Sequence, residues 1–122
     1  MLEEEIWGRE EEYFTRLYKA DYAGVLELVH SQFLGWPSTE PQPLDKQGSG
    51  RFMQQLVPHP VSCTVKIERK GIRVREGVAL THYLLYVDYN SGSAGAKTKI
   101  SRITHAWVKE NRQWKLLGGV SA

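Results

Sequence analysis

The chain is poor in cysteine and has no long apolar run, and each shortage excludes a class of protein. Cys63 is the only cysteine among 122 residues, so no internal disulfide can form, and we interpret it as a small core residue. No apolar run approaches the ~20 residues that span a bilayer, so no membrane partner is expected. The opening residues, Met-Leu-Glu-Glu-Glu-Ile, are acidic where a targeting peptide is basic, which predicts a cytoplasmic protein.

The chain also has a low net charge and lacks the common ligand-binding motifs. The formal net charge is only +2, and no cluster of Lys or Arg concentrates it, so we expect no nucleic-acid partner. The glycines at 48, 50, 92 and 95 form no phosphate-cradling motif, and no cofactor is expected. No metal site is predicted either, because no short spacing such as His-x-x-x-His relates the four histidines, which are His30, His59, His82 and His105.

The composition that remains is that of a globular protein. Apolar residues make up 41% and charged residues 25% of the chain. A chain of this length has room for one hydrophobic core but not for two. We therefore predict a single domain over residues 1–122.

The first half of the chain is predicted to be helical. Residues 3–20 carry an apolar stripe that includes Ile6, Tyr13 and Leu17, and acidic residues open the segment. Asp21 is predicted to be the N-cap of a second helix over residues 22–32. Three prolines between Phe33 and Pro43 predict an irregular segment there, and a short third helix is expected over residues 49–56.

From Val61 onward the apolar period changes to two, which is typical of strands. The parity flips after Gly71; this indicates a bulge in one long strand, with a hairpin turn at Lys70-Gly71 as the competing interpretation. Further strands are predicted over residues 78–89, 98–109 and 113–121, with a Gly/Ser loop over 90–97.

The strand at 78–89 is apolar on both parities, which indicates that both of its faces are covered. The helices can cover one face of the sheet, and a second copy of the chain is the simplest cover for the other. The predicted architecture is α+β, with N-terminal helices packed in the concave face of a curved, mainly antiparallel sheet. A concave pocket at its open mouth is the default ligand site.

Three stretches, taken in order, resemble the SnoaL-like branch of the nuclear transport factor 2-like superfamily: residues 18–22, residues 33–37 and residues 107–119. Ketosteroid isomerases, polyketide cyclases and the association domain of calcium/calmodulin-dependent protein kinase II share that fold. The resemblance implies a cystatin-like cone, usually dimeric through the sheet, with a pocket between helices and sheet. It places one strand face outward as the predicted homodimer surface, around Leu80, His82, Leu84 and Tyr86.

The catalytic positions of ketosteroid isomerases are matched only in part. Tyr13, eight residues before Asp21, has the spacing of the tyrosine that donates to the oxyanion in that family. The place of the carboxylate base falls near Trp36-Pro37, with Glu40 several residues away, and residues 98–108 contain no Asp or Glu for the second acid. Ketosteroid isomerisation is therefore not predicted.

His105 is the polar residue of most interest, because it shares strand parity with Trp107. It could act as base or acid in a pocket, or be a structural histidine bonded to a neighbour. Tyr13 could donate to a ligand or be an ordinary core tyrosine. Glu10, one turn earlier, could pair with Tyr13 or His105, or lie at the helix edge in water. The predicted ligand-binding set is Tyr13, Trp36, Tyr83, His105 and Trp107.

Three functions are compatible with this pattern. The first is a homodimeric SnoaL-like domain with a mostly apolar small-molecule pocket. The second is a ketosteroid isomerase- or polyketide cyclase-like enzyme that uses His105 as base and Tyr13 to stabilise an enolate oxygen. The third is a pure dimerisation or association module. Fold alone does not decide among these functions. The missing carboxylates favour the first and third over the second.

Overall fold

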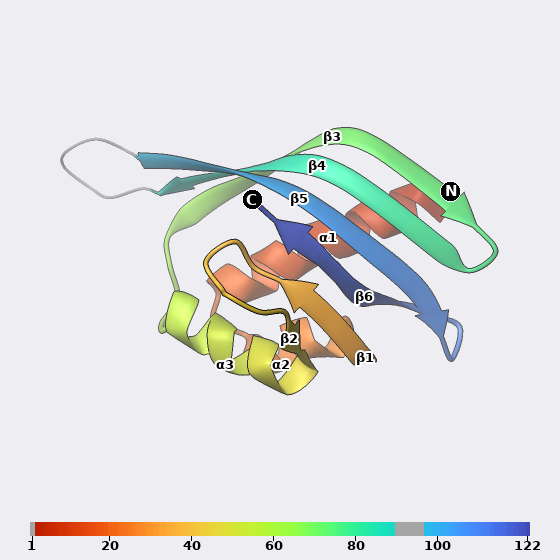
Figure 1. Cartoon of the computed structure of the whole chain (residues 1–122). Coiled ribbons are helices and arrows are strands. Elements are labelled where there is room, and N and C mark those ends of the chain that lie inside the picture. Colours follow the sequence, from red (N-terminus) through yellow and green to blue (C-terminus); the bar gives the residue numbers. More distant parts are fainter. Residues whose placement is uncertain (1, 90–96) are drawn as a thin grey trace.

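A single curved sheet wrapped over a long N-terminal helix is the main feature of the computed structural model, which describes residues 2–89 and 97–122 (Figure 1). The elements, in order, are α1 (Leu2–Tyr18), α2 (Tyr22–Glu27), β1 (Val29–Trp36), β2 (Leu44–Asp45), α3 (Lys46–Leu56), β3 (Cys63–Arg75), β4 (Val78–Tyr89), β5 (Lys97–Glu110) and β6 (Gln113–Ser121). The sheet order is β2-β1-β6-β5-β4-β3, and among the described strands only the β1–β6 pair is parallel. This confirms the predicted α+β class.

The helices lie on the concave side of the sheet. Figure 1 shows α1 running beneath the sheet, with α2 and α3 on the side where β1 and β2 lie. Two groups of buried apolar residues fill the space between α1 and the strands, one around Tyr83 and the other around Trp107 and Trp114. No helix among residues 2–89 and 97–122 is long and apolar enough to cross a membrane.

Helix α1 forms as its sequence pattern predicts. Glu3, Glu4 and Glu5 occupy its first turn, where the helix dipole favours negative charge. Its buried residues recur at helical spacing and face the sheet: Ile6, Trp7, Glu10, Phe14 and Leu17. Asp21 then caps α2 as predicted, because its side chain accepts a hydrogen bond from the Gly24 amide at 3.0 Å.

The predicted helix over 22–32 is wrong beyond Glu27. Residues 29–36 form β1 instead, so the irregular segment predicted from Phe33 was also wrong as far as Trp36. The Leu116 amide donates to the Leu28 carbonyl at 2.8 Å, and β1 continues in parallel with β6. Pairing with a strand more than 80 residues away therefore overrides the local helical pattern. Helix α3 also begins earlier than predicted, at Lys46, because Asp45 caps it.

The long strand with a bulge is confirmed. Strand β3 is continuous from Cys63 to Arg75, and its register against β4 shifts between Arg69 and Gly71. The alternative hairpin at Lys70-Gly71 is wrong. The turn between β3 and β4 uses Glu76 and Gly77, whose φ angles are 50° and 79°. Residues 90–96 of the predicted Gly/Ser loop lie outside the described residues.

Strand register places small residues beside the most interesting histidine. Along one row of the concave face, Thr81 of β4 pairs with His105 of β5, His105 with Gly119 of β6, and Gly119 with Gly35 of β1. Directly opposed residues point to the same face of a sheet. His105 therefore has a threonine on one side and two residues without side chains on the other.

Candidate functional site: a histidine held by a buried glutamate

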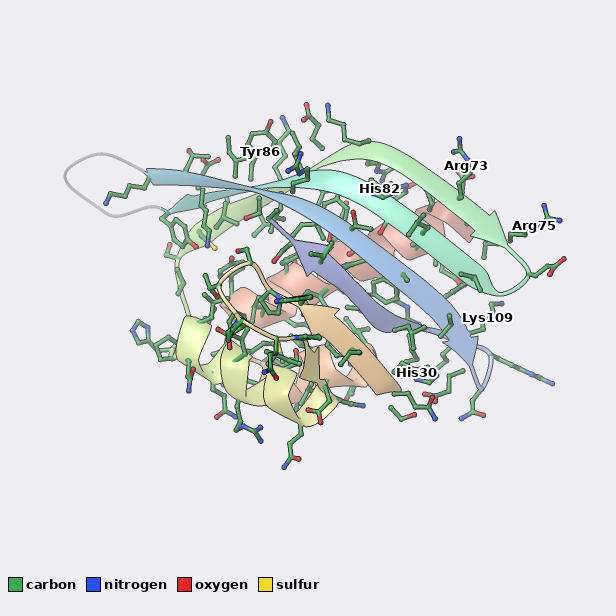
Figure 2. All side chains as sticks on the ribbon, viewed as in Figure 1. His30, Arg73, Arg75, His82, Tyr86 and Lys109 are labelled. Atoms are coloured by element: carbon green, nitrogen blue, oxygen red, sulfur yellow. The ribbon has the colours of Figure 1, made fainter. Side chains whose placement is uncertain are left out.

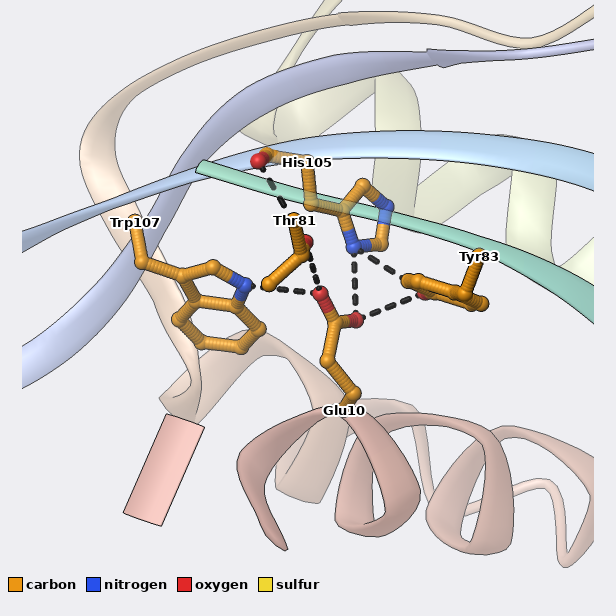
Figure 3. Close-up of polar contacts among 5 residues, drawn as sticks. All are labelled: Glu10, Thr81, Tyr83, His105 and Trp107. Carbon is orange, nitrogen blue, oxygen red and sulfur yellow. Dashed lines mark hydrogen bonds and ion pairs between the residues drawn. The ribbon is translucent and has the colours of Figure 1, made fainter. Parts of the chain in front are cut away.

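A single buried carboxylate organises the polar part of the concave face. Glu10 of α1 has no solvent exposure, and four side chains from β4 and β5 donate to it (Figure 3). Its Oε1 accepts from the Tyr83 hydroxyl and His105 Nδ1, both at 2.7 Å. Its Oε2 accepts from Thr81 Oγ1 at 2.7 Å and Trp107 Nε1 at 2.9 Å. A carboxylate has about four acceptor positions, so Glu10 is fully hydrogen-bonded.

Glu10 is ionised at neutral pH despite its burial. Desolvation by itself opposes the charge, but the attraction of a protonated His105 and the hydrogen bonds from His105, Thr81 and Tyr83 outweigh it, so the pKa of Glu10 lies below its ordinary value. An ionised carboxylate only accepts hydrogen bonds. Every group around it must therefore donate, and this requirement extends to the imidazole ring.

His105 is thereby oriented by the helix opposite. Because Glu10 only accepts, Nδ1 of the imidazole carries a hydrogen whether the ring is neutral or protonated. Figure 3 shows the second ring nitrogen turned away from Glu10. The His105 side chain is 12% exposed, and the residue lines a cavity on the concave face. Of the interpretations left open by the sequence, pairing of Glu10 with His105 is the one that the structure contains.

Tyr83 and Trp107 are placed differently from Tyr13 and His105. Both are buried, at 1% and 0% exposure, and both donate to Glu10. Burial, followed by the charge and hydrogen bond of Glu10, raises the pKa of Tyr83 well above its ordinary value, so its hydroxyl remains a donor. Neither residue is among those that line the cavity. Their ligand contact stays a prediction, while their hydrogen bonds hold Glu10 in position.

The cavity of about 130 Å³ lies between the helices and the strands beside His105. Its walls are mostly apolar and include Phe14, Leu17, Phe33, Met53, Ile103 and Leu116. Gly35 and Gly119 also line it, and the ring of Phe33 packs over Gly35, where an added Cβ would lie 2.5 Å from Phe33 Cζ. A Cβ added to Gly119 would lie 2.8 Å from His105 Cδ2 and 2.0 Å from the Thr104 carbonyl oxygen, so a side chain cannot be accommodated there.

Tyr13 borders the same cavity as His105, with 5.8 Å between the two ring centroids. Burial, followed by the nearby charge of Glu10, raises the pKa of Tyr13 to about 12, so the hydroxyl is protonated at neutral pH. The structure therefore brings the two principal candidates together. Trp36 is also at the cavity, but it is 47% exposed and its Nε1 donates to the Glu40 carbonyl at 2.7 Å, which places it at the rim.

The described part of the chain holds no group of three or more His, Cys, Asp or Glu side chains arranged for a metal ion. Among the described residues that line the cavity there is no Lys, Arg, Asp or Glu. The chemistry that the cavity offers is thus that of His105, the Tyr13 hydroxyl and the serine hydroxyls of Ser49 and Ser121.

The central role of Glu10 was not predicted from the sequence, although two signals were present. Glu10 lies three residues after Trp7 and four before Phe14, so it falls within the buried stripe of α1. Thr81 and Tyr83, like His105 and Trp107, are spaced two apart and share a strand face. What the sequence does not contain is the register that brings both strand pairs over one turn of the helix.

Comparison with known proteins identifies the fold and nothing narrower. No family model and no curated protein matches the sequence. A nuclear transport factor 2-like protein of unknown function from Shewanella oneidensis is 12% identical, with a TM-score of 0.80 over 99% of this chain and 98% of its own. The association domain of calcium/calmodulin-dependent protein kinase II from C. elegans is 13% identical, with a TM-score of 0.78 over 99% and 95% of the two chains.

A third solved structure, a ketosteroid isomerase-like protein from Parabacteroides distasonis, is 14% identical, with a TM-score of 0.72 over 95% of this chain and 83% of its own. Identities this low establish architecture but not activity. They confirm the fold that the resemblance implied: the chain has the nuclear transport factor 2-like fold, which is also described as cystatin-like.

Proposed function

We propose that this chain is a small-molecule-binding domain whose ligand occupies the cavity at His105. The observation that carries the proposal is the 2.7 Å contact between Glu10 and His105 Nδ1. A buried charge costs several kcal/mol of desolvation, and an apolar side chain of similar size would often stabilise a fold as well. Unlike an apolar side chain, the buried Glu10 carboxylate holds the His105 imidazole in one orientation beside the cavity.

The lining of the cavity supports a mostly apolar ligand. Phe14, Phe33 and Met53 supply apolar surface, and the described lining residues include no charged Lys, Arg, Asp or Glu. One water molecule needs about 10–15 Å³, so a cavity of about 130 Å³ has room for several non-hydrogen atoms. Burial of apolar ligand surface would supply most of the affinity.

Toluene is a suitable probe of this proposal, because it offers apolar surface and no polar group. We expect a titration followed by amide chemical shifts to perturb residues at the cavity, among them Ile103 and Gly119. Leu56 lines the cavity and is 48% exposed, so Leu56→Trp should block the mouth and abolish the shifts. Val78 is equally exposed and lies outside the cavity lining, so Val78→Trp is the matched control. Absence of shifts in the wild-type protein would contradict the proposal.

The contact between Glu10 and His105 also favours a second candidate, an enzyme in which His105 is a general base. A carboxylate that holds Nδ1 leaves the other nitrogen to take a proton, and Tyr13 could stabilise an enolate oxygen. Cyclohexanone in D₂O is a test substrate, because exchange of its α-protons reports on such a base. We expect exchange above the buffer rate that His105→Gln removes. If toluene binds but no exchange is seen, the enzyme proposal is wrong and only the binding function is supported.

We also propose that the chain forms a homodimer through the convex face of its sheet. Leu80, Ile100 and Val120 are exposed there by 38%, 57% and 51%, and Leu84, four residues after Leu80 in β4, points to the same face. Figure 2 shows His82 and Tyr86 on the side of the sheet away from the helices. The similar C. elegans structure is named an association domain, which supports oligomer formation. Light scattering tests the proposal, and a monomer at micromolar concentration would contradict it.

A further inference from the structure

The hydrogen-bonding state of His105 restricts what kind of ligand can bind. Because Glu10 Oε1 lies 2.7 Å from Nδ1 and accepts its hydrogen, the neutral form of the imidazole has its lone pair on Nε2. No side chain among the described residues donates to Nε2, and Figure 3 shows this nitrogen on the side of the ring away from Glu10. The neutral ring therefore presents an acceptor, and a ligand that meets it must supply a hydrogen-bond donor.

The electrostatic surroundings disfavour an anionic ligand. The described residues around the cavity provide no Lys or Arg to pair with an anion. The negative charge of Glu10 lies directly behind the imidazole, at 2.7 Å from Nδ1. A carboxylate placed at Nε2 of the neutral ring would therefore face a lone pair and a second buried negative charge, without a fixed cation.

Tyr13 offers the complementary group. Its hydroxyl is protonated at neutral pH, and its ring lies 5.8 Å from that of His105 at the same cavity. No other side chain among the described residues hydrogen-bonds to this hydroxyl, so it is free to donate to a ligand oxygen. One ligand hydroxyl can then donate to His105 Nε2 and accept from Tyr13.

The remaining walls favour a flat apolar body. Phe14, Phe33 and Phe52 contribute aromatic rings to the lining, and the Phe33 ring covers the backbone of Gly35. Aromatic ligands pack well against such rings in edge or offset arrangements.

We infer that the ligand is an uncharged, largely apolar molecule, such as a phenol, that presents one hydroxyl to His105 Nε2 and Tyr13. This inference names the ligand class of the site and rests on the proposed small-molecule-binding function.

Four probes of similar shape test it: p-cresol, 4-methylanisole, toluene and 4-methylbenzoate. Dissociation constants are measured by amide shift titration at an alkaline pH of about 8.5, because the neutral imidazole is the form that accepts a hydrogen bond. p-Cresol should bind about five- to tenfold more tightly than 4-methylanisole, which has the oxygen but no donor. 4-Methylbenzoate should bind most weakly. Equal binding of p-cresol and 4-methylanisole, or tightest binding of 4-methylbenzoate, would overturn the inference.

Matched variants assign the effect to one residue. His105→Phe keeps a ring and removes the acceptor, so p-cresol and 4-methylanisole should bind about equally. His82→Phe makes the same change on the convex face and should leave the preference for p-cresol intact. The ranking of the four probes on the wild-type protein decides the question even if His105→Phe does not fold. If toluene binds but p-cresol shows no advantage, only the ligand class is wrong; if none of the four binds, the binding function fails and the inference with it.

Discussion

The two faces of strands β4 and β5 differ: the concave face carries a buried hydrogen-bond network and the convex face is exposed. On the concave face, Thr81 and Tyr83 of β4 and His105 and Trp107 of β5 all donate to Glu10. On the convex face, exposed or half-buried apolar residues such as Leu80 lie near His82, which contacts Thr104 at 2.8 Å, and the exposed Arg102 lies opposite Leu84. Both faces contain a histidine with a hydrogen-bonded neighbour, but only the buried one is held by a charge.

The difference shows that burial determines how much a polar contact contributes to the stability of the fold. An exposed hydrogen bond exchanges protein partners for water at little net gain, whereas a buried donor left without its acceptor bears the full desolvation cost. The concave face should therefore respond strongly to the loss of one polar atom. The convex face should respond to a change in its apolar surface.

The largest effect is expected from Glu10→Ala. This change leaves the Thr81, Tyr83 and Trp107 donors buried without a common acceptor, and it opens a cavity between α1 and the sheet. We expect a loss of about 3–5 kcal/mol in the free energy of unfolding, measured by urea denaturation. Glu11→Ala, on the exposed side of the same helix, is the control. A loss below about 1 kcal/mol would mean that the cluster contributes little to stability.

On the convex face, Leu80→Arg should convert a dimer to a monomer. Leu80 is 38% exposed in the isolated chain, and an arginine at that position would have to be buried without a partner in the proposed interface. We expect at least about a hundredfold weaker self-association by light scattering, with little change in unfolding of the monomer. Unchanged self-association would place the interface elsewhere.

Acid should weaken the concave cluster. The pKa of Glu10 is lowered from an ordinary value of 4.5, so its charge stabilises the folded state above about pH 4.5 and this stabilisation is lost as pH falls toward the folded pKa. The difference in unfolding free energy between the wild type and Glu10→Gln should therefore be largest near neutral pH and shrink below about pH 4.5.

Glu4→Gln provides the comparison for this titration. The pKa of Glu4 is also lowered, chiefly by its hydrogen bond with Arg69, but that pair is exposed. Added salt should reduce the effect of Glu4→Gln and leave that of Glu10→Gln nearly unchanged, because buried charges are poorly screened. The same salt response for both would contradict a buried ionised Glu10.

The smallest effects come from one substitution made on both faces. Thr81→Val removes a buried donor to Glu10, and we expect a loss of about 1–3 kcal/mol in unfolding free energy. Thr104→Val removes the exposed contact with His82 and should change stability by no more than about 0.5 kcal/mol. Equal losses would show that the two faces do not differ in the way proposed.

Local patterns were sufficient to predict most of the elements and the fold. The apolar stripe of α1, the alternation from Cys63 onward and the bulge near Gly71 each follow from residue spacing within one segment. The same patterns placed Tyr13 and His105 on the faces that meet at the cavity. Only the stretch after Glu27 was predicted as the wrong element, because β1 depends on pairing with β6 at the other end of the chain.

The tertiary structure alone decided the site. In sequence, Glu10 is one acidic residue among several on a surface-like helix, and a buried charge becomes tolerable only when four donors from two strands converge on it. Likewise, Gly35 and Gly119 lie 84 residues apart, and their common role beside His105 exists only once β1 and β6 pair. The sequence determined which side chains point inward, because strand and helix periods are local properties. Which of them meet was decided by register and packing, which depend on the whole chain.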